Sequence, residues 1–357
     1  MVDLEFENED RSKYSIKSDA VRFTWAGYMI FVLISSLLGD SVILVGSVKY
    51  RAIRLHKIIV VTIQHIAVCD LLLSCTCALP KLVSLLTNRW VFGNYLCFML
   101  FRPMEYYLNA ASLLLICCMT CSKLAILKYP LRKITLRVAH WTCSTCWFTA
   151  LIIPAVASFV GGSADDVYFS YKSYTCTADY SSEVWPWMLP LMAVTFILLP
   201  ICLVIGITIC LLVIANKVAL RNRGCVRWQG VMTTILIATV YCISLVPYAI
   251  YCVAKFRFSC ENGENSFFHS HFLRLAISFI YFNTMSNFYV YCLTVASFRE
   301  FLRERFHVFH QFCTGRSGKV TVLNRDQENV RNRELSLLGE EIGQTHWLSY
   351  VTRRARG

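Results

Sequence analysis

The sequence predicts an all-α membrane protein, a bundle of seven transmembrane helices followed by an amphipathic eighth helix. Hydrophobic residues make up 56% of the 357 residues and charged residues only 16%, and the mean hydropathy is +0.52. A soluble domain carries about 25% charged residues, and a disordered chain is poor in apolar residues and rich in charge. Long windows almost free of charge recur along the chain, which indicates a polytopic membrane protein.

Seven windows predict the spans, because a helix that crosses a bilayer needs about 20 mostly apolar residues. In chain order they are Phe23–Val48, Ile58–Pro80, Pro103–Ser122, Trp141–Ala164, Val184–Asn216, Trp228–Ala254 and Leu275–Phe298. The first three contain Asp40, His65, Asp70 and Glu105, whereas the last four contain no charged residue. None of the windows alternates with a period of two, so helices are expected rather than strands.

The distribution of Lys and Arg predicts the orientation, because both are enriched in short cytoplasmic loops. The basic residues that follow the first, third and fifth windows are Lys49, Arg51, Arg54, Lys57, Lys123, Lys128, Arg132, Lys133, Arg137, Lys217, Arg221, Arg223 and Arg227. Acidic residues offset the basic ones in the opposite loops. We therefore expect a multi-pass plasma-membrane protein with its N-terminus outside and its C-terminus in the cytoplasm. The net charge of +13 reflects this topology, and no nucleic-acid partner is expected.

The two ends of the chain differ in character from the bundle, which is predicted to cover residues 23–296. Residues 1–22 are polar and acidic and read as an extracellular tail without a signal peptide. An apolar stripe in residues 297–313 predicts the amphipathic helix, which lies on membrane lipid of the inner leaflet. Cys313 at its end is a candidate for palmitoylation. Residues 314–357 have little hydrophobic pattern and are expected to be a disordered cytoplasmic tail.

Most of the 18 cysteines lie within the windows, where they behave as small hydrophobic residues. Three lie on the predicted outer side, which is oxidising and favours disulfides. Cys97 and Cys176 are the natural pair, since their bond would tie the long loop before the fifth window to the third. Cys260 is left either free or paired with Cys252.

Several short motifs occur in order at compatible spacing. They are Gly39-Asp40, Ala67-Val68-Cys69-Asp70, Trp90-Val91-Phe92-Gly93 before Cys97, Trp147-Phe148-Thr149-Ala150, Phe196 with Pro200, Leu245-Val246-Pro247-Tyr248, and Asn283 with Asn287-Phe288-Tyr289-Val290-Tyr291. Together with the seven windows and the outer cysteines, they resemble the rhodopsin-like (class A) G-protein-coupled receptors over residues 23 to about 313. The resemblance implies an extracellular ligand, a heterotrimeric G protein as partner, and a G-protein face that includes Ser122, Lys123, Arg227 and Tyr291.

The departures from this family lie at its moving parts, so the chain resembles a divergent member. The span-three Asp-Arg-Tyr motif falls on residues 121–123 or on residues 122–124, depending on the frame, and neither frame contains the arginine. Phe288 stands in place of the span-seven proline, and Leu245 in place of the span-six tryptophan. Weak G-protein coupling is therefore expected.

Two carboxyl groups at membrane depth mark a polar core, because intramembrane acids are costly and usually functional. The resemblance implies that Asp70, Asn283 and Asn287 line a pocket able to hold a sodium ion, with Asp40 in place of the family's span-one asparagine. Two close carboxylates resist joint ionisation, so the pair either holds a cation or shares a proton. The alternative is a protonated Asp40 bonded to the backbone.

The ligand pocket implied by the resemblance contains Lys81, Met104, Glu105, Tyr248 and Tyr281. Met104 stands where amine receptors carry an aspartate, and Tyr281 where opsins carry the retinal-binding lysine, so neither an amine nor retinal is expected. Glu105 either meets a cationic ligand or pairs with Arg102 or Lys81. Lys81 lines the pocket or extends to the lipid headgroups.

The loop segment 167–176 is rich in aromatic and β-forming residues and reads as a hairpin arm that ends at Cys176. By analogy with family members that have such a hairpin, it favours a peptide ligand; the alternative is a simple lid.

The most consistent function is therefore a cell-surface receptor for an extracellular ligand. The alternatives are a receptor-shaped protein without G-protein signalling and, with Asp40, Asp70 and Glu105 as a proton path, a proton or ion transporter. No catalytic motif is present, so no enzyme activity is expected. Apart from sodium, neither a cofactor nor a metal site is expected.

Overall fold

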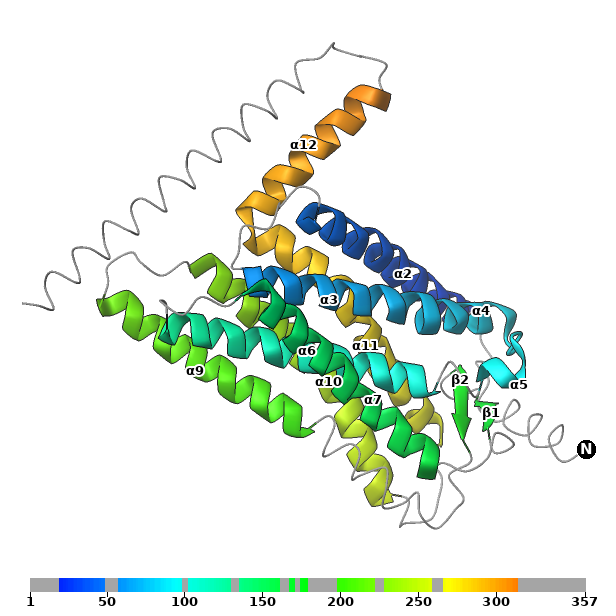
Figure 1. Ribbon diagram of the computed structural model, residues 1–357. Coiled ribbons are helices and arrows are strands. Elements are labelled where there is room, and N and C mark those ends of the chain that lie inside the picture. Colours follow the sequence, from blue (N-terminus) through cyan, green and yellow to red (C-terminus); the bar gives the residue numbers. More distant parts are fainter. Residues whose placement is uncertain are drawn as a thin grey trace, which may run out of the picture. The chain divides into compact units, whose positions relative to one another are not determined.

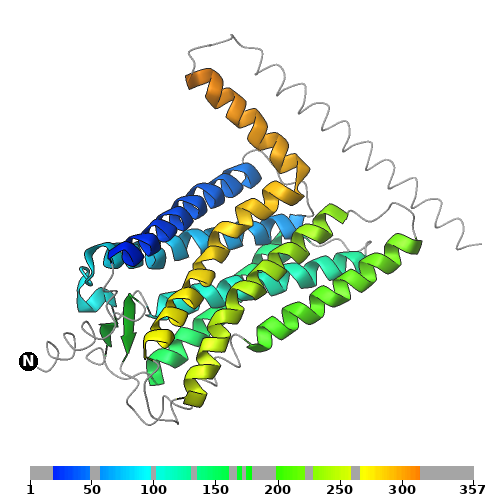
Figure 2. The same cartoon turned by 180° about the vertical axis from the view of Figure 1, so that it is seen from behind.

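A computed structural model describes residues 19–48, 57–97, 102–129, 135–160, 167–170, 174–178, 198–221, 228–258 and 266–313. Figures 1 and 2 show the chain from two opposite sides. The chain divides into two units, Met1–Phe301 and Leu302–Gly357, and the helical bundle belongs to the first. Residues 1–18 of the expected N-terminal tail and all of the expected C-terminal tail, residues 314–357, lie outside the described residues.

Seven long helical segments are found in the described part of the chain, one for each predicted span. They are α2 (Asp19–Val48), α3 (Lys57–Leu73) continued by η1 (Ser74–Ala78) and α4 (Leu79–Thr87), α6 (Arg102–Lys128), α7 (Leu136–Val160), α9 (Leu199–Arg221), α10 (Trp228–Phe258) and α11 (Ser266–Thr294). Two further helices are α5 (Gly93–Leu96) and α12 (Ala296–Cys313). Four stretches are long and apolar enough by themselves to cross a membrane: Ala20–Val48, Lys57–Thr87, Met104–Lys128 and Gly230–Tyr251. The predicted all-α bundle is confirmed.

The helix ends differ from the predicted windows. Helix α2 begins at Asp19, so residues 19–22 are helical rather than part of a tail, and α6 continues beyond Ser122 to Lys128. Helix α11 already ends at Thr294, and Phe298 belongs to α12. Charge is excluded from the hydrocarbon region but not from a helix, since Lys and Arg are good helix formers. The windows therefore mark the apolar part of each helix and not its ends.

Helices α3 and α6 make most of the contacts within the bundle. Helix α3 packs against α2, α6 and α7, and α6 also packs against α9 and α10, while α11 lies between α10 and α2 (Figures 1 and 2). Large apolar side chains nevertheless remain exposed on outward faces, among them Phe148 at 69% and Leu293 at 73%. In water such a surface would be unfavourable, so these faces suit lipid.

A π-helical segment, η1, joins α3 to α4. The backbone N–H of Leu79 donates to the carbonyl of Ser74, five residues earlier instead of four. Pro80 follows, and in a regular α-helix its ring would clash with the carbonyl four residues earlier. The wider turn relieves this clash without ending the helix.

A small hairpin caps one end of the bundle. Strands β1 (Val167–Ser170) and β2 (Thr175–Ala178) are antiparallel, with Phe169 opposite Cys176. Tyr174, just before β2, is 2% exposed, and its hydroxyl donates to the side-chain oxygen of Asn88 at 3.1 Å. Asn88 ends α4 in the left-handed conformation, with φ of 51°. This contact ties the hairpin to α4, and we call this end of the bundle the hairpin end.

Candidate functional site

Two charged side chains and a tyrosine meet inside the hairpin end, and we call Lys81, Glu105 and Tyr281 the hairpin-end cluster. Tyr281 of α11 is fully buried, and its hydroxyl donates to Oε1 of Glu105 on α6 at 2.9 Å. The sequence analysis considered Arg102 or Lys81 as the partner of Glu105, and not this tyrosine. The bond links α6 to α11 at the level where the resemblance places the ligand.

Lys81 of α4 completes the cluster. Its Nζ lies 5.4 Å from the centre of the Tyr281 ring, which is the geometry of a cation–π contact. The side chain is only 8% exposed, and Nζ has no hydrogen-bond partner among the described residues. Lys81 therefore points into the bundle, and the expectation that it extends to the lipid headgroups is wrong.

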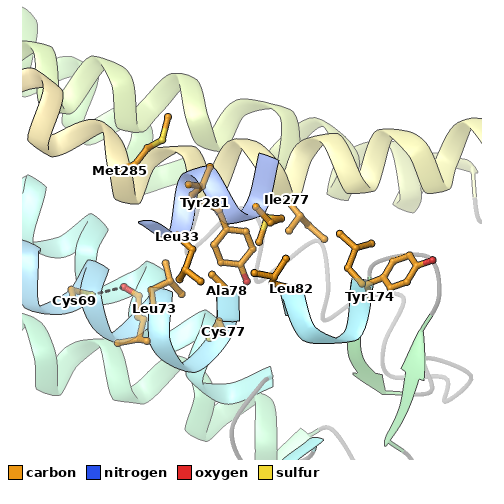
Figure 3. Close-up of a cluster of buried hydrophobic side chains, with 14 of the residues drawn as sticks. Leu33, Cys69, Leu73, Cys77, Ala78, Leu82, Tyr174, Ile277, Tyr281 and Met285 are labelled. Carbon is orange, nitrogen blue, oxygen red and sulfur yellow. Dashed lines mark hydrogen bonds between the residues drawn. The ribbon is translucent and has the colours of Figure 1, made fainter. Parts of the chain in front are cut away.

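The remaining predicted ligand residues, Met104 and Tyr248, are partly buried and pack against the same apolar cluster as Tyr281. Tyr248 also stacks on Tyr251, with ring centres 6.3 Å apart. Figure 3 shows the buried members of the cluster, in which the Tyr281 ring lies among side chains of α2, α3, η1, α4 and α11. The five residues singled out from the sequence thus gather in one region.

Sequence reasoning missed Tyr174 and Arg274. The guanidinium carbon of Arg274, on α11, lies 5.6 Å from the centre of the Tyr174 ring, and Arg274 is 7% exposed. Both residues join the hairpin to the helices, but Arg274 directly precedes an apolar window and so looked like a topological charge. Outside that window, burial and the Arg274 guanidinium lower the pKa of the His271 imidazole.

A disulfide is present at the hairpin end. Cys97 is disulfide-bonded, and it follows the short helix α5. Cys176 lies in β2 opposite Phe169, and its pairing with Cys97 stays a prediction. Cys260 lies outside the described residues.

Replacing Cys176 by serine is expected to lower the thermal stability, because a disulfide typically contributes about 2–4 kcal/mol. The melting temperature of the purified protein and its delivery to the cell surface measure the effect. Cys75→Ser is the matched control, since Cys75 is a free cysteine. A peptide map by mass spectrometry that found Cys97 and Cys176 both as free thiols would contradict the pairing.

The second group of polar residues is the polar core, around Asp40 on α2 and Asp70 on α3. Both are 1% exposed, and the two carboxyl groups are close enough to interact electrostatically. Asn287 Nδ2 donates to Oδ2 of Asp70 at 2.6 Å. Asn283 is also buried, on the same helix as Asn287.

Asp40 is bonded differently from either sequence alternative. Ser36 donates its hydroxyl proton to Oδ2 of Asp40 at 2.8 Å, and the two serine oxygens of Ser36 and Ser74 are also 2.8 Å apart. Oδ1 of Asp40 has no hydrogen-bond partner in the described part of the chain. A buried carboxyl oxygen without a donor suits either a proton held by the pair or a cation with oxygen ligands. No group of three or more His, Cys, Asp or Glu among the described residues is arranged to hold a metal, so sodium would depend on neutral oxygens as well.

Replacing Asp40 by asparagine is expected to leave the melting temperature unchanged or to raise it, because one of two like buried charges is removed. If the pair shares a proton, the wild type should melt at lower temperature as pH rises, since loss of that proton leaves two facing carboxylates. If it holds sodium, the salt should raise the melting temperature, and Asp70→Ala should abolish the rise. A marked drop in the melting temperature of Asp40→Asn would contradict the expectation.

At the other end of the bundle, the predicted G-protein residues are enclosed. Ser122 and Lys123 of α6 are 9% and 8% exposed, and the Ser122 oxygen lies 4.0 Å from the sulfur of Cys118. Tyr291 is 1% exposed and its ring packs edge-on against Phe298 at 6.2 Å. Arg227 lies outside the described residues. The structure therefore gathers Ser122, Lys123 and Tyr291 in the interior of the bundle and leaves Arg227 unplaced.

Phe288 occupies a site that only a glycine opposite it allows. A β-carbon placed on Gly39 of α2 would lie 2.6 Å from the β-carbon of Phe288 and 2.9 Å from its Cγ. The Phe288 ring also packs against Tyr289 and Phe298. Helix α11 runs without interruption through Phe288, as expected where a residue with a backbone N–H replaces proline.

The remaining sequence candidates are less informative. Cys313 is the last residue of α12, and its side chain is outside the described part. The cysteines of the spans whose side chains the structure describes are free, which agrees with their role as small hydrophobic residues.

Comparison with known proteins adds a family to this geometry. A family model described as "7 transmembrane receptor (rhodopsin family)" matches residues 41–291. The type-1 angiotensin II receptor of Cavia porcellus is 32% identical over 133 residues, covering 36% of this chain and 36% of that receptor. The same receptor of Meriones unguiculatus is 29% identical over 160 residues, 43% of this chain and 42% of that one. The octopamine receptor beta-3R of Drosophila melanogaster is 24% identical over 132 residues, 36% of this chain and 10% of that receptor. The chain thus spans less than half the length of these curated relatives.

Proposed function

Because the chain belongs to the rhodopsin family of seven-transmembrane receptors, a family of multi-pass plasma-membrane proteins and not of enzymes, we propose that it binds an extracellular ligand at its hairpin end and signals to heterotrimeric G proteins from its opposite end. The Lys and Arg distribution supports this orientation, since the loops after the first, third and fifth spans are the basic ones. The N-terminus is then outside and α12 lies on the cytoplasmic side.

The hairpin-end cluster is the observation that carries the proposal. Lys81, Glu105 and Tyr281 place two ionisable groups and a phenol inside an apolar end of the bundle, bonded across two helices. Polar groups buried among apolar side chains are the usual specificity elements of a ligand site. A purely structural core would need none of them.

A peptide is the favoured ligand class. The hairpin pinned by Tyr174 to Asn88 provides backbone and aromatic surface beside the cluster, which suits an extended chain better than a small amine. Tyr281 has no amino group with which to form a Schiff base with retinal, so light sensing is disfavoured. The names of the relatives, angiotensin II and octopamine receptors, do not decide between ligand classes.

A binding screen that does not depend on signalling tests the proposal most directly. Extracellular peptides and small molecules are added to the purified protein, and the shift of its melting temperature is recorded. Hits are then tested for ligand-dependent nucleotide exchange on G proteins. If no compound of any class shifts the melting temperature, the ligand-binding proposal is wrong.

A receptor-shaped protein without G-protein signalling is the second candidate, and the opposite end of the bundle favours it. Neither Ser122 nor Lys123 has the guanidinium of the family's span-three arginine, and Phe288 replaces the family's proline. Ligand binding without nucleotide exchange on any G protein would select this candidate over the first.

A further inference from the structure

The ammonium group of Lys81 has unmet bonding capacity. An ammonium has three N–H donors and no acceptor, yet Nζ of Lys81 is buried and has no hydrogen-bond partner in the described residues. Its one printed contact is with the ring face of Tyr281 at 5.4 Å. A buried charge without hydrogen bonds is unfavourable, so an acceptor supplied from outside the chain would be favoured at this position.

Glu105 is the nearest candidate to satisfy Lys81, but it is engaged elsewhere. Its Oε1 accepts the hydroxyl of Tyr281, and its attraction for Lys81 acts without a hydrogen bond between them. Arg274, a second buried cation, repels Lys81 electrostatically. The electrostatic balance around Lys81 therefore leaves room for one more negative charge.

The surroundings of Lys81 are apolar and aromatic. The cluster around Tyr281 includes Leu82, Tyr174 and Ile277, which Figure 3 shows beside the tyrosine ring. A free inorganic anion would lose its hydration here without compensation from these side chains. A carboxylate carried on an apolar or aromatic group would match both the charge and the walls.

We propose that the ligand of the hairpin-end cluster carries a carboxylate next to an apolar or aromatic group, and that Lys81 binds this carboxylate. The inference rests on the proposed function, because it specifies the ligand of the same site. The carboxylate oxygens accept from Nζ, the apolar group packs on the Tyr281 side of the cluster, and Glu105 stays bonded to Tyr281. A peptide with a free C-terminus and a small carboxylic acid share this chemistry.

Pairs of compounds that differ only in charge test the proposal. The pairs are 3-phenylpropionate with 3-phenylpropanamide, octanoate with octanamide, and short apolar peptides with a free or an amidated C-terminus. Binding to the purified full chain is measured by the shift of its melting temperature and by titration. We expect the acids to bind and the amides to bind at least about tenfold more weakly, since hydrogen bonds to charged groups contribute that much. The pair with the larger effect identifies a peptide or a small acid as the source of the carboxylate.

Lys81→Met should reduce binding of the acids to the level of the amides, and Lys81→Gln serves as a second variant of similar length. The matched control is Lys57→Met, because Lys57 lies at the exposed start of the same helical span. Without ligand, Lys81→Met should melt at the same or a higher temperature, since an unpartnered buried charge is removed.

Three results would overturn the inference: equal binding of acids and amides, acid binding that survives Lys81→Met, and a panel in which no acid binds. If neutral or cationic compounds bind while no acid does, the receptor proposal stands and only the carboxylate inference falls. If no compound of any charge binds, both fall.

Discussion

Replacing Gly39 by alanine is expected to destabilise the bundle by about 1–3 kcal/mol, the usual cost of forcing extra volume into a packed core. The new β-carbon would lie 2.6 Å from the β-carbon of Phe288. Both atoms are attached directly to helical backbone, so no side-chain rotation separates them. Helices α2 and α11 would have to move apart, and the contacts of Phe288 with Phe298 would be disturbed.

Gly27→Ala is the matched control, because Gly27 lies in the same helix and a β-carbon there meets nothing within 4 Å. Alanine is the better helix former by about 1 kcal/mol, so this variant should melt at the same or a higher temperature. Thermal melting of both purified variants measures the difference. Equal melting temperatures would mean that α2 and α11 are not packed as closely at this point as the contact requires.

The double substitution Ser122→Arg with Phe288→Pro is expected to raise nucleotide exchange on G proteins about fivefold or more, the lower range of typical coupling between distant sites. The unmodified chain should show little exchange. Arginine offers a planar cation with several donors, whereas Ser122 is neutral and Lys123 is a point charge without that fork. Proline removes a backbone N–H from α11 and favours a kink.

The buried position of Ser122 and Lys123 defines how this experiment is controlled. Lys123→Arg with Phe288→Pro tests the other frame of the motif, and Ser122→Gln tests side-chain size without charge. Exchange is measured on a panel of G proteins in membranes with equal amounts of each variant. Strong exchange by the unmodified chain that neither double variant changes would show that coupling does not depend on these positions.

The fold could be predicted from the sequence because the bilayer imposes a simple rule on it. Charge is excluded from each apolar window, and a helix satisfies its own backbone hydrogen bonds there. The rule is blind to helix ends, which is why the helical start at Asp19 and the end at Thr294 were not predicted.

The candidate site could be predicted in part. The motif matches selected Glu105 and Tyr281 separately, but nothing in a one-dimensional pattern states that a phenol of α11 reaches a carboxylate of α6, 176 residues earlier. The same holds for Tyr174, whose left-handed backbone and bond to Asn88 depend on how a loop folds back. Lys81 was ambiguous for another reason: a lysine near the end of a span can extend outward or inward, and packing alone decides.

The wide turn at Ser74–Ala78 makes one stretch of this helix tolerant of a change in length. An α-helix turns by about 100° per residue, so the loss of one residue from a regular stretch rotates everything that follows onto a different face. The loss of one residue from η1 would instead convert the π turn into an ordinary α turn. Asp70 before it and Lys81 after it would keep their facings, and the polar core and the hairpin-end cluster would both survive. Insertions and deletions that accumulate over evolution can therefore be absorbed here, between two sites that tolerate none themselves.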